Sequence, residues 1–276
     1  MAAEKGIQKV CLTIAGLDPS GGAGIVADIK TFSAFGCFAA AAAASITFQN
    51  TTGVFGAVHQ DASSIRGQAD AVFDDLEIAA VKTGMLPTGP VITEIASILK
   101  ERSVSDLVVD PVARSTSGYD LIDDNALKVL VKELFPLSLV VTPNLAEAER
   151  ITGIQIRGRD DIEKAARDIL SMGAANVLMK GGHFPDAEGF EKKARDVLFD
   201  SDGRSQVFEV DYIDTSATHG TGCTLAAAIT ANLALGKDLS SAIAISKQFV
   251  TRAIATSKHL GNGSSPINIP AIAFDL

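Results

Sequence analysis

The chain has 276 residues, 47% of them hydrophobic, which is enough for one large α/β domain with a buried core. Its 33 acidic and 24 basic residues give a net charge of −9, which argues against nucleic acid and anionic membranes as partners because both would be repelled. The three cysteines, Cys11, Cys37 and Cys223, are widely spaced and indicate neither a disulfide framework nor a zinc site.

Strand-like apolar runs alternate with helical patterns along the whole chain. The predicted strands cover 10–15, 39–48, 54–58, 79–82, 106–109, 137–141, 176–179, 197–199 and 206–210. The predicted helices cover 25–35, 63–76, 91–99, 124–134, 147–151, 161–172, 225–235 and 240–257. The last two strands flank Ser201-Asp202-Gly203, which is typical of a hairpin. The alternation predicts a mostly parallel sheet with helices on both faces, and since no linker or repeat interrupts it, residues 1–276 are predicted to form a single domain.

The sequence shows no targeting or membrane segment. Residues 1–9 carry mixed charge and lack the apolar core of a signal peptide. The alanine run at 39–44 is far shorter than the roughly 20 apolar residues that span a bilayer. We therefore expect a cytoplasmic protein with no membrane partner, which agrees with its unpaired cysteines.

The stretch 214–236 passes from polar residues through Gly220-Thr221-Gly222-Cys223 into a long run of helix-forming residues. Gly236 stands where a helix of this length would end. The two glycines of the turn therefore belong to the start of a helix, where backbone amides lack partners and the macrodipole adds positive potential. With no side chains in the way, an anion can approach these amides, and phosphate transfer is the simplest use for such a site.

Cys223 lies in the same turn. A thiol at the N-terminus of a helix has a lowered pKa and can act as a base or a nucleophile. The alternative is a buried, unreactive cysteine, which is a common environment for a free thiol.

Polar residues recur where the predicted strands end. They are Asp18, Gln49, Asn50, Lys82, Asp110, Asn144, Glu147 and Lys180. Each alone suits a cap or a turn, but ligands bind at the carboxyl ends of strands in such sheets, and together these residues favour a site. Asp110 and Glu147 offer hard oxygen ligands for Mg²⁺, and Lys180 can neutralise the phosphates of a nucleotide. The amide of Gln49 both donates and accepts, which matches the edge of an aminopyrimidine ring.

Two other nucleotide-binding motifs agree poorly with the sequence. Residues 22–27 match G-x-G-x-x-A, but turn residues separate them from the preceding strand, and the next strand ends in Gln49 instead of an acid. No G-x-x-x-x-G-K-[ST] occurs in the chain. Phosphate binding is therefore assigned to the turn at Gly220.

A set of motifs is distributed over nearly the whole chain. They are D-P-S-G-G-A-G at 18–24, Q-N-T at 49–51, K-T-G-M-L at 82–86, V-V-D-P-V at 108–112, V-T-P-N-L-A-E-A at 141–148, L-M-K-G-G-H at 178–183 and T-H-G-T-G-C-T-L at 218–225. With them the chain resembles the hydroxymethylpyrimidine/phosphomethylpyrimidine kinases of thiamine biosynthesis, a family with the ribokinase-like, three-layer α/β/α fold. The resemblance implies a homodimer that uses ATP and Mg²⁺ to phosphorylate 4-amino-5-hydroxymethyl-2-methylpyrimidine and then its monophosphate.

The resemblance also implies roles for single residues. Around the pyrimidine it places Asp28, Gln49, Met85, Val112 and the backbone of Gly22 and Ala23. Near the nucleotide and Mg²⁺ it places Asn144, Glu147, Lys180 and Thr218. Cys223 falls where sugar kinases of the same fold have a catalytic aspartate, so it either takes the proton of the hydroxyl or positions that hydroxyl. The family's usual S-G-D reads Ser117-Gly118-Tyr119-Asp120 here, which is a departure from the pattern.

Other functions stay open at this point. A pyridoxal kinase, or an enzyme with both activities, has the same fold and cysteine site, although Gln49 favours the pyrimidine because pyridoxal has no matching amino edge. A sugar or nucleoside kinase would be expected to carry G-A-G-D instead of Gly220-Thr221-Gly222-Cys223. A nucleotide-binding regulator without catalysis would not need the acids and the lysine. A thiol hydrolase would use His219, for which the sequence shows no orienting acid.

Overall fold

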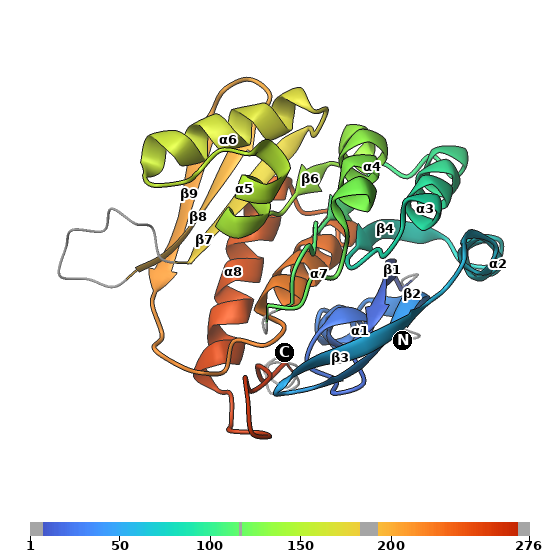
Figure 1. The fold of residues 1–276 in the computed structure, drawn as a ribbon, viewed down its shortest axis with the longest axis horizontal. Helices are drawn as coiled ribbons and strands as arrows, with labels where there is room; N and C mark the ends of the chain where they lie inside the picture. Colours follow the sequence, from blue (N-terminus) through green and yellow to red (C-terminus); the bar gives the residue numbers. More distant parts are fainter. Residues whose placement is uncertain (1–7, 116–117, 183–192, 270–276) are drawn as a thin grey trace, which may run out of the picture.

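The computed structural model describes residues 8–115, 118–182 and 193–269, and its centre is one mixed β-sheet (Figure 1). The strands are β1 (Val10–Leu17), β2 (Phe38–Asn50), β3 (Gly53–His59), β4 (Ile78–Thr83), β5 (Leu107–Val109), β6 (Val140–Val141), β7 (Asn176–Gly182), β8 (Lys193–Asp200) and β9 (Ser205–Asp211). Their order in the sheet is β3-β2-β1-β4-β5-β6-β7-β8-β9. The pairs from β2 through β7 are parallel, whereas β2–β3, β7–β8 and β8–β9 are antiparallel.

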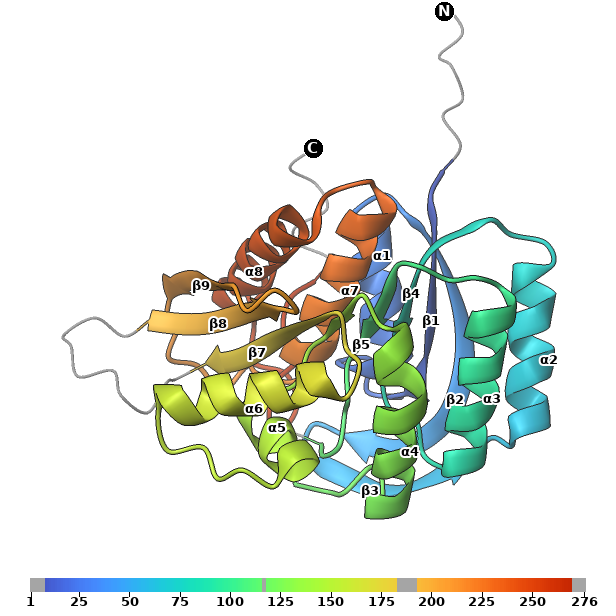
Figure 2. The same ribbon diagram turned by 90° about the horizontal axis from the view of Figure 1, so that it is seen from above.

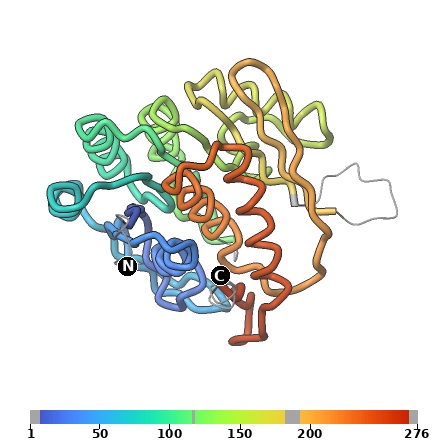
Figure 3. The backbone as a smooth tube through the Cα atoms, turned by 180° about the vertical axis from the view of Figure 1, so that it is seen from behind, coloured from blue at the N-terminus to red at the C-terminus, as the bar shows by residue number. Residues whose placement is uncertain are grey.

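Helices cover both faces of the sheet. They are α1 (Gly24–Ala34), α2 (Ala62–Phe73), α3 (Gly89–Glu101), α4 (Asp124–Leu134), α5 (Leu145–Thr152), α6 (Arg159–Ser171), α7 (Thr221–Ala234) and α8 (Leu239–Ala255), with a 3₁₀ turn at Phe135–Leu137. Helices α2 to α6 line one face, and α1, α7 and α8 cover the other (Figures 2 and 3). The predicted three-layer arrangement with a mostly parallel sheet is therefore confirmed.

The central strands are continuous apolar runs because both of their faces are covered. In β1 every residue from Val10 to Gly16 is buried. Helix α7 lies deepest among the helices, since all its residues from Thr224 to Ala234 are buried. Its alanines allow the backbone to approach the sheet and α8 closely, and this packing fixes the position of its first turn.

Polar caps set the starts of several helices. The carboxylates of Asp61, Asp123 and Asp238 accept hydrogen bonds from amides three residues later, which satisfies first-turn donors of α2, α4 and α8. At α5, Asn144 and Glu147 form a capping box, in which each side chain bonds the backbone amide of the other residue. The expected role of Asn144 as a helix cap is confirmed. The capping box also holds Asn144 and Glu147, two predicted site residues, in a fixed position relative to each other.

Most predicted elements agree with the structure to within a few residues, and α4 has the predicted bounds. The strand predicted at 137–141 is wrong in its first half, because Pro136 lies in a 3₁₀ turn and only Val140–Val141 pair in the sheet. The early pair β2–β3 is an antiparallel hairpin that the alternation of elements did not predict. In the described part of the chain, no helix is both long and apolar enough to cross a bilayer.

Candidate active site

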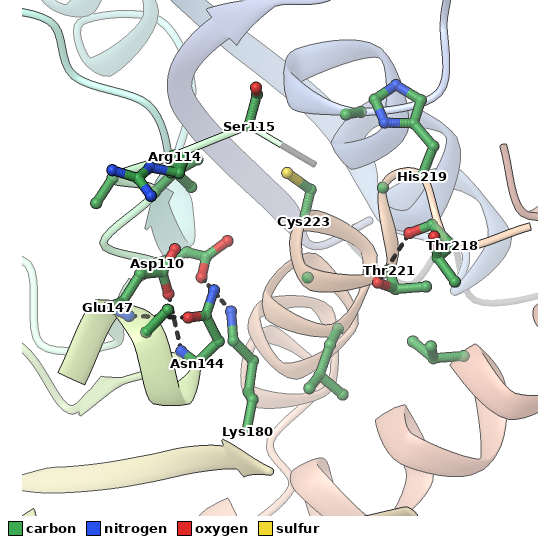
Figure 4. Close-up of a pocket in the computed structure, with 18 of the residues that line it drawn as sticks. Asp110, Arg114, Ser115, Asn144, Glu147, Lys180, Thr218, His219, Thr221 and Cys223 are labelled. Carbon is green, nitrogen blue, oxygen red and sulfur yellow. Dashed lines mark hydrogen bonds and ion pairs between the residues drawn. The ribbon is translucent and has the colours of Figure 1, made fainter. Parts of the chain in front are cut away.

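A cavity of about 1270 Å³ opens where the parallel strands end and α7 begins (Figure 4). Its volume exceeds the roughly 300–1,000 Å³ of a single small-molecule site, so it has room for two substrates at once. The predicted site residues that line it are Ala23, Gln49, Met85, Asp110, Val112, Asn144, Glu147, Lys180, Thr218, Gly220, Thr221, Gly222 and Cys223. These residues come from distant segments of the chain and lie around one cavity.

The first turn of α7 is built on two glycines. Gly220 has φ +84°, and a Cβ placed there would lie 1.8 Å from the carbonyl oxygen of Gly22, so the position accepts only glycine. The amides of Gly222 and Cys223 belong to the first turn and have no acceptor within the helix. A Cβ at Gly222 would lie 3.3 Å from Lys180 Nζ and 4.0 Å from Asp110 Oδ2. The bare backbone of Gly222 therefore faces the acid and the lysine across open space.

Asp110 and Lys180 form a partly buried ion pair at this edge of the sheet. Lys180 Nζ donates to Asp110 Oδ1 at 2.7 Å, and the hydroxyl of Thr142 donates to the same oxygen at 3.0 Å. Lys180 is at the end of β7 and Asp110 follows β5, so the sheet brings them together over 70 residues of chain. The second oxygen of Asp110 faces Gly222, as the distance from the hypothetical Cβ shows.

Glu147 lies beside this pair (Figure 4). Its Oε2 accepts from the amide of Asn144 at 2.8 Å, and Asn144 Oδ1 accepts from the amide of Glu147 at 2.9 Å. Burial raises the pKa of Glu147 to about 7, an increase that Lys180 opposes and Asp110 reinforces. Burial by itself lowers the pKa of Lys180, but Asp110 and Glu147 more than offset this, and its pKa lies above the usual range. Lys180 is therefore a cation at neutral pH, while Glu147 titrates there.

The two acids suit a magnesium ion. Mg²⁺ is usually held by one or two carboxylates together with waters and substrate phosphates. Asp110 and Glu147 both line the cavity, and the absence of a side chain at Gly222 leaves space in front of them. Within the described ranges, no three acidic, histidine or cysteine side chains are arranged to hold a metal ion by themselves, so this donor set would leave most of the coordination to water and phosphate.

Cys223 is partly exposed at the centre of the site, between the acids and the Thr218–Thr221 turn (Figure 4). Burial raises the pKa of its thiol to about 11, while Lys82 lowers it and Asp28 and Asp110 raise it. The prediction that the helix N-terminus would lower this pKa is therefore wrong. Burial of the sulfur among protein atoms and the two nearby carboxylates outweigh the favourable end of the helix.

The opposite wall is formed by β2 and the loops after β4 and β5. Gln49 lines the cavity from β2, and its Oε1 accepts from the hydroxyl of Thr47 at 3.1 Å. Met85 is only 8% exposed and packs against Gly16, where a Cβ would lie 2.8 Å from the methionine sulfur. Gln49 and Cys223 therefore share one cavity, as a ring-binding wall facing a phosphate-binding turn requires.

Two predicted substrate-binding residues lie outside the cavity wall. Asp28 is fully buried, and its carboxylate is occupied by Lys82 and Thr13, so it lies behind Lys82. Gly22 packs against His219, since a Cβ there would lie 2.3 Å from the imidazole ring. Its neighbour Ala23 does line the cavity. The expectation that Asp28 and Gly22 line the pocket is thus corrected, because other side chains cover both.

The sequence did not reveal the partner of His219. Its Nε2 lies 2.7 Å from Asp18 Oδ2, and this carboxylate also accepts from the amide of Ala23 at 3.0 Å. Burial raises the pKa of Asp18, but bonds from His219 and Ser20 reverse the effect, and it is lowered overall. An acid therefore does orient His219. The pair joins the 18–24 loop to the start of α7.

Three further polar residues line the cavity, and of these only Lys82 was among the predicted strand-end residues. Lys82 is fully buried and pairs with Asp28. Lys247 of α8 donates to Asp196 of β8 at 2.6 Å, on the side of the cavity lined by the end of β9. Arg114 bonds Asp120 at 2.9 Å, in the loop that departs from the family pattern, of which Ser117 is outside the described residues. Neither Lys247 nor Arg114 was predicted, since neither follows a predicted strand.

Comparison with known proteins adds the following. Residues 18–268 match the family model described as phosphomethylpyrimidine kinase. The chain is 42% identical over 257 residues to the hydroxymethylpyrimidine/phosphomethylpyrimidine kinase of Bacillus subtilis, covering 93% of each chain. It is 43% identical to the thiamine biosynthesis bifunctional protein ThiED of Geobacter sulfurreducens over 93% of this chain and 51% of that protein.

Solved structures agree. The phosphomethylpyrimidine kinase of Clostridium difficile superimposes with a TM-score of 0.78 at 43% identity, covering 90% of this chain and all of that one. The pyridoxal kinase of Staphylococcus aureus in complex with ADP gives a TM-score of 0.87 at 32% identity, covering 96% of this chain and 95% of that one.

Proposed function

The chain belongs to the phosphomethylpyrimidine kinase family, and we propose that it transfers the γ-phosphate of ATP to 4-amino-5-hydroxymethyl-2-methylpyrimidine and then to the resulting monophosphate. It is a kinase, and the reaction belongs to thiamine biosynthesis, as the names of its relatives say of those proteins. Use of ATP is supported by the pyridoxal kinase that was solved with ADP. We infer that the reaction takes place in the cytoplasm.

In the proposed reaction the hydroxymethyl oxygen attacks the γ-phosphorus. A new oxygen–phosphorus bond forms, the bond from this phosphorus to the bridging oxygen of ADP breaks, and the hydroxyl proton passes to Cys223 Sγ, which must first have lost its own proton because its thiol pKa is about 11. The free amides of Gly222 and Cys223 stabilise the charge on the migrating group, as oxyanion-type donors do. Lys180 neutralises phosphate oxygens, and Asn144 and Thr218 contact the nucleotide.

Gln49 orients the pyrimidine by bonding its amino edge, with Met85 and Val112 enclosing the ring. The backbone at Ala23 lies beside it. Asp110 and Glu147 would hold Mg²⁺, which when bound screens the phosphate charges and aligns the γ-phosphate. Asn144 keeps Glu147 in place through the capping box.

One observation carries the proposal: the α7 amides, the Lys180–Asp110 pair and Gln49 all face one cavity. The test is incubation of the purified protein with Mg-ATP and the hydroxymethylpyrimidine, with mass spectrometry of the products and a coupled assay for ADP. We expect the mono- and diphosphate, and a Cys223→Ala variant that binds ATP but turns over slowly. Absence of ADP release with any alcohol in a panel of pyrimidines, pyridoxal and sugars would contradict the assignment to a kinase.

A second candidate is phosphorylation of pyridoxal, by this enzyme in addition or instead. It is favoured by the similarity to a pyridoxal kinase, with a TM-score of 0.87. Gln49 decides between the two, because its paired donor and acceptor match the aminopyrimidine and not the pyridoxal ring. Turnover of pyridoxal without turnover of the pyrimidine would reverse the order.

We also propose that the enzyme is a homodimer. Ile46, Phe48 and Val58 are 43%, 55% and 52% exposed. They share one face of the β2–β3 hairpin, because Ile46 pairs with Val58 and Phe48 with Gly56. Gln49 faces the cavity on the other side. The β2–β3 hairpin therefore has an exposed apolar face on the side opposite the cavity, and a second copy of the chain could pack against this face. Light scattering should give twice the monomer mass, and Phe48→Ser should reduce it; a monomer at micromolar concentration would contradict this proposal.

A further inference from the structure

Thr142 is a fully buried threonine next to the two acids of the site, and the reaction as described does not use it. Its hydroxyl donates to Asp110 Oδ1 at 3.0 Å, the same oxygen that accepts from Lys180 Nζ at 2.7 Å. The side chain of Thr142 has no exposed surface and does not line the cavity, so it does not touch a substrate. Any effect of Thr142 on the chemistry must therefore pass through Asp110.

The backbone fixes the hydroxyl of Thr142 beside this carboxylate. Thr142 and Asp110 directly follow β6 and β5, which are parallel neighbours in the sheet. The amide of Thr142 donates to the carbonyl oxygen of Val109 at 2.9 Å, which extends the pairing of these strands by one residue. Pro143 comes next, and the residue before a proline is restricted in its backbone. Because threonine is branched at Cβ, its χ1 angle is restricted as well.

The two donors on Oδ1 leave the other oxygen of Asp110 to the cavity. Oδ2 is turned towards Gly222, where a Cβ would lie 4.0 Å from it. Lys180 alone would not fix this orientation, because an ammonium group has three donors and can bond either carboxylate oxygen or both. The hydroxyl of Thr142 holds Oδ1 from a second direction and so determines which oxygen faces the cavity.

The buried carboxylate of Asp28 shows what the alternative looks like. Lys82 bonds both of its oxygens, at 2.9 and 2.7 Å, and the hydroxyl of Thr13 donates to Oδ2 at 2.6 Å. The same two donor types therefore occupy Asp28 completely, whereas at Asp110 they share one oxygen. Without the threonine hydroxyl, the carboxylate of Asp110 can rotate until Lys180 bonds both oxygens, and Oδ2 is then withdrawn from the cavity.

We propose that Thr142 is a positioning residue for Asp110: its hydroxyl holds the carboxylate so that Oδ2 remains available to a divalent cation. Loss of a hydrogen-bond partner of a metal ligand usually lowers the affinity for the metal by about 10–100-fold. Glu147, the second acid, is held in a comparable way by its capping box with Asn144. The part played by a cation rests on the proposed function.

The test measures metal binding without turnover. Mn²⁺ serves as the probe because it prefers the same carboxylate and water ligands as Mg²⁺. The protein is titrated with Mn²⁺ and ADP, and ion held on the protein is detected by faster relaxation of the water protons. Binding of ADP alone is measured by calorimetry in EDTA. Thr142→Val removes the hydroxyl and should weaken binding of Mn²⁺ with ADP by at least about tenfold, with the affinity for ADP alone unchanged.

This difference separates positioning from general damage, which would weaken both kinds of binding and would overturn the proposal. Thr142→Ser keeps the hydroxyl and should bind Mn²⁺ with ADP within about threefold of the wild type, less than 1 kcal/mol. In an Asp110→Asn background, Thr142→Val should have no further effect, because Thr142 acts through Asp110. Wild-type affinity in Thr142→Val, a loss in Thr142→Ser equal to that in Thr142→Val, or additive losses in the double variant would each overturn the proposal. If Thr142→Val does not fold, Thr142→Ala takes its place with the same expected results.

Thr83→Val is the matched control. Thr83 is also fully buried at the end of a strand, β4, which pairs with β5 on the other side from β6. Among the described residues its hydroxyl has no hydrogen-bond partner, so its removal should leave both affinities unchanged. A loss of Mn²⁺ binding equal to that in Thr142→Val would overturn the specific role of Thr142.

Kinase assays are made separately, so that the two proposals can fail independently. A wild type that binds Mn²⁺ with ADP but does not phosphorylate the pyrimidine overturns the proposed function, while the binding results still decide the role of Thr142. A wild type that phosphorylates the pyrimidine, with normal Mn²⁺ binding in Thr142→Val, overturns only the role of Thr142. A wild type on which Mn²⁺ does not strengthen the binding of ADP overturns that role as well.

Discussion

Replacement of Gly222 by alanine separates catalysis from stability in this site. Gly222 is the second residue of α7 and has no left-handed backbone, so alanine suits its conformation. Alanine in a helix interior is favoured over glycine by about 1 kcal/mol, and by less near a helix end. The new methyl group would lie 3.3 Å from Lys180 Nζ, the flexible end of a side chain. We therefore expect the free energy of unfolding to change by no more than about 0.5 kcal/mol.

The effect on activity should be much larger. The methyl group would occupy the space between the α7 amides, Lys180 and Asp110, where we place the migrating phosphate. The amides themselves remain, but the methyl group would keep the phosphate from reaching them, and losing contact with one preorganised donor of this kind costs about 10²–10³ in rate, or about 3–4 kcal/mol. We expect kcat/KM to fall by about that factor, as measured by ADP release, with an unchanged thermal midpoint.

Gly67→Ala is the matched control. Gly67 lies within α2, far from the cavity wall, and a Cβ there would meet nothing within 4 Å. The change should stabilise the protein by up to about 1 kcal/mol and leave kcat/KM unchanged. If kcat/KM of Gly222→Ala stays within about threefold of the wild type, the activation free energy has changed by less than 1 kcal/mol. That result would refute the assignment of the phosphate site.

Three other outcomes follow from the same geometry. Gly220→Ala should lower the free energy of unfolding by about 2–4 kcal/mol in urea titrations, because its Cβ would lie 1.8 Å from the oxygen of Gly22 at φ +84°. Glu147, whose pKa is raised to about 7, must lose its proton to bind Mg²⁺, so kcat at limiting Mg²⁺ should rise with pH through about 7. The midpoint of this rise should move to lower pH as Mg²⁺ is added, and the pH dependence should disappear in Glu147→Gln. The sign for stability is the reverse: the folded state holds this proton longer, so the contribution of Glu147 to stability decreases as pH rises from 4.5 to about 7. Lys180→Met should lower kcat/KM for ATP by about 10²-fold in the ADP assay, and an unchanged value would show that Lys180 serves only Asp110.

Local patterns were sufficient to predict much of this fold and part of the site. The start of α7 was recognisable because glycines followed by a long helix-forming run leave amides free whatever the tertiary structure. The acids and Lys180 at strand ends were recognisable because parallel strands bring their carboxyl ends to one edge. These inferences depend on periodicity and on short-range rules, and such rules hold wherever the segment is packed.

Properties that arise from distant contacts were not predictable in this way. Asp18 and His219 are 201 residues apart, and Asp28 and Lys82 are 54 apart. In neither pair does the sequence around one residue indicate which distant residue it will contact. The pKa of Cys223 was predicted with the wrong sign for the same reason. The helix end is a local feature, whereas burial and the approach of two carboxylates depend on the whole fold.

The charges of the site explain how a protein with a net charge of −9 receives a polyphosphate. Three lysines that line the cavity are already paired, Lys82 with Asp28, Lys180 with Asp110 and Lys247 with Asp196. A phosphate that approaches Lys180 therefore also approaches the carboxylate of Asp110. The repulsion between these two anions is relieved only if a cation binds to both of them. Bound Mg²⁺ would do this at Asp110 and Glu147, so that nucleotide and metal favour each other's binding. Lys82 stays outside this exchange because Asp28 has no access to the cavity. Lys180 can thereby exchange Asp110 for a phosphate oxygen, whereas Lys82 stays paired with Asp28.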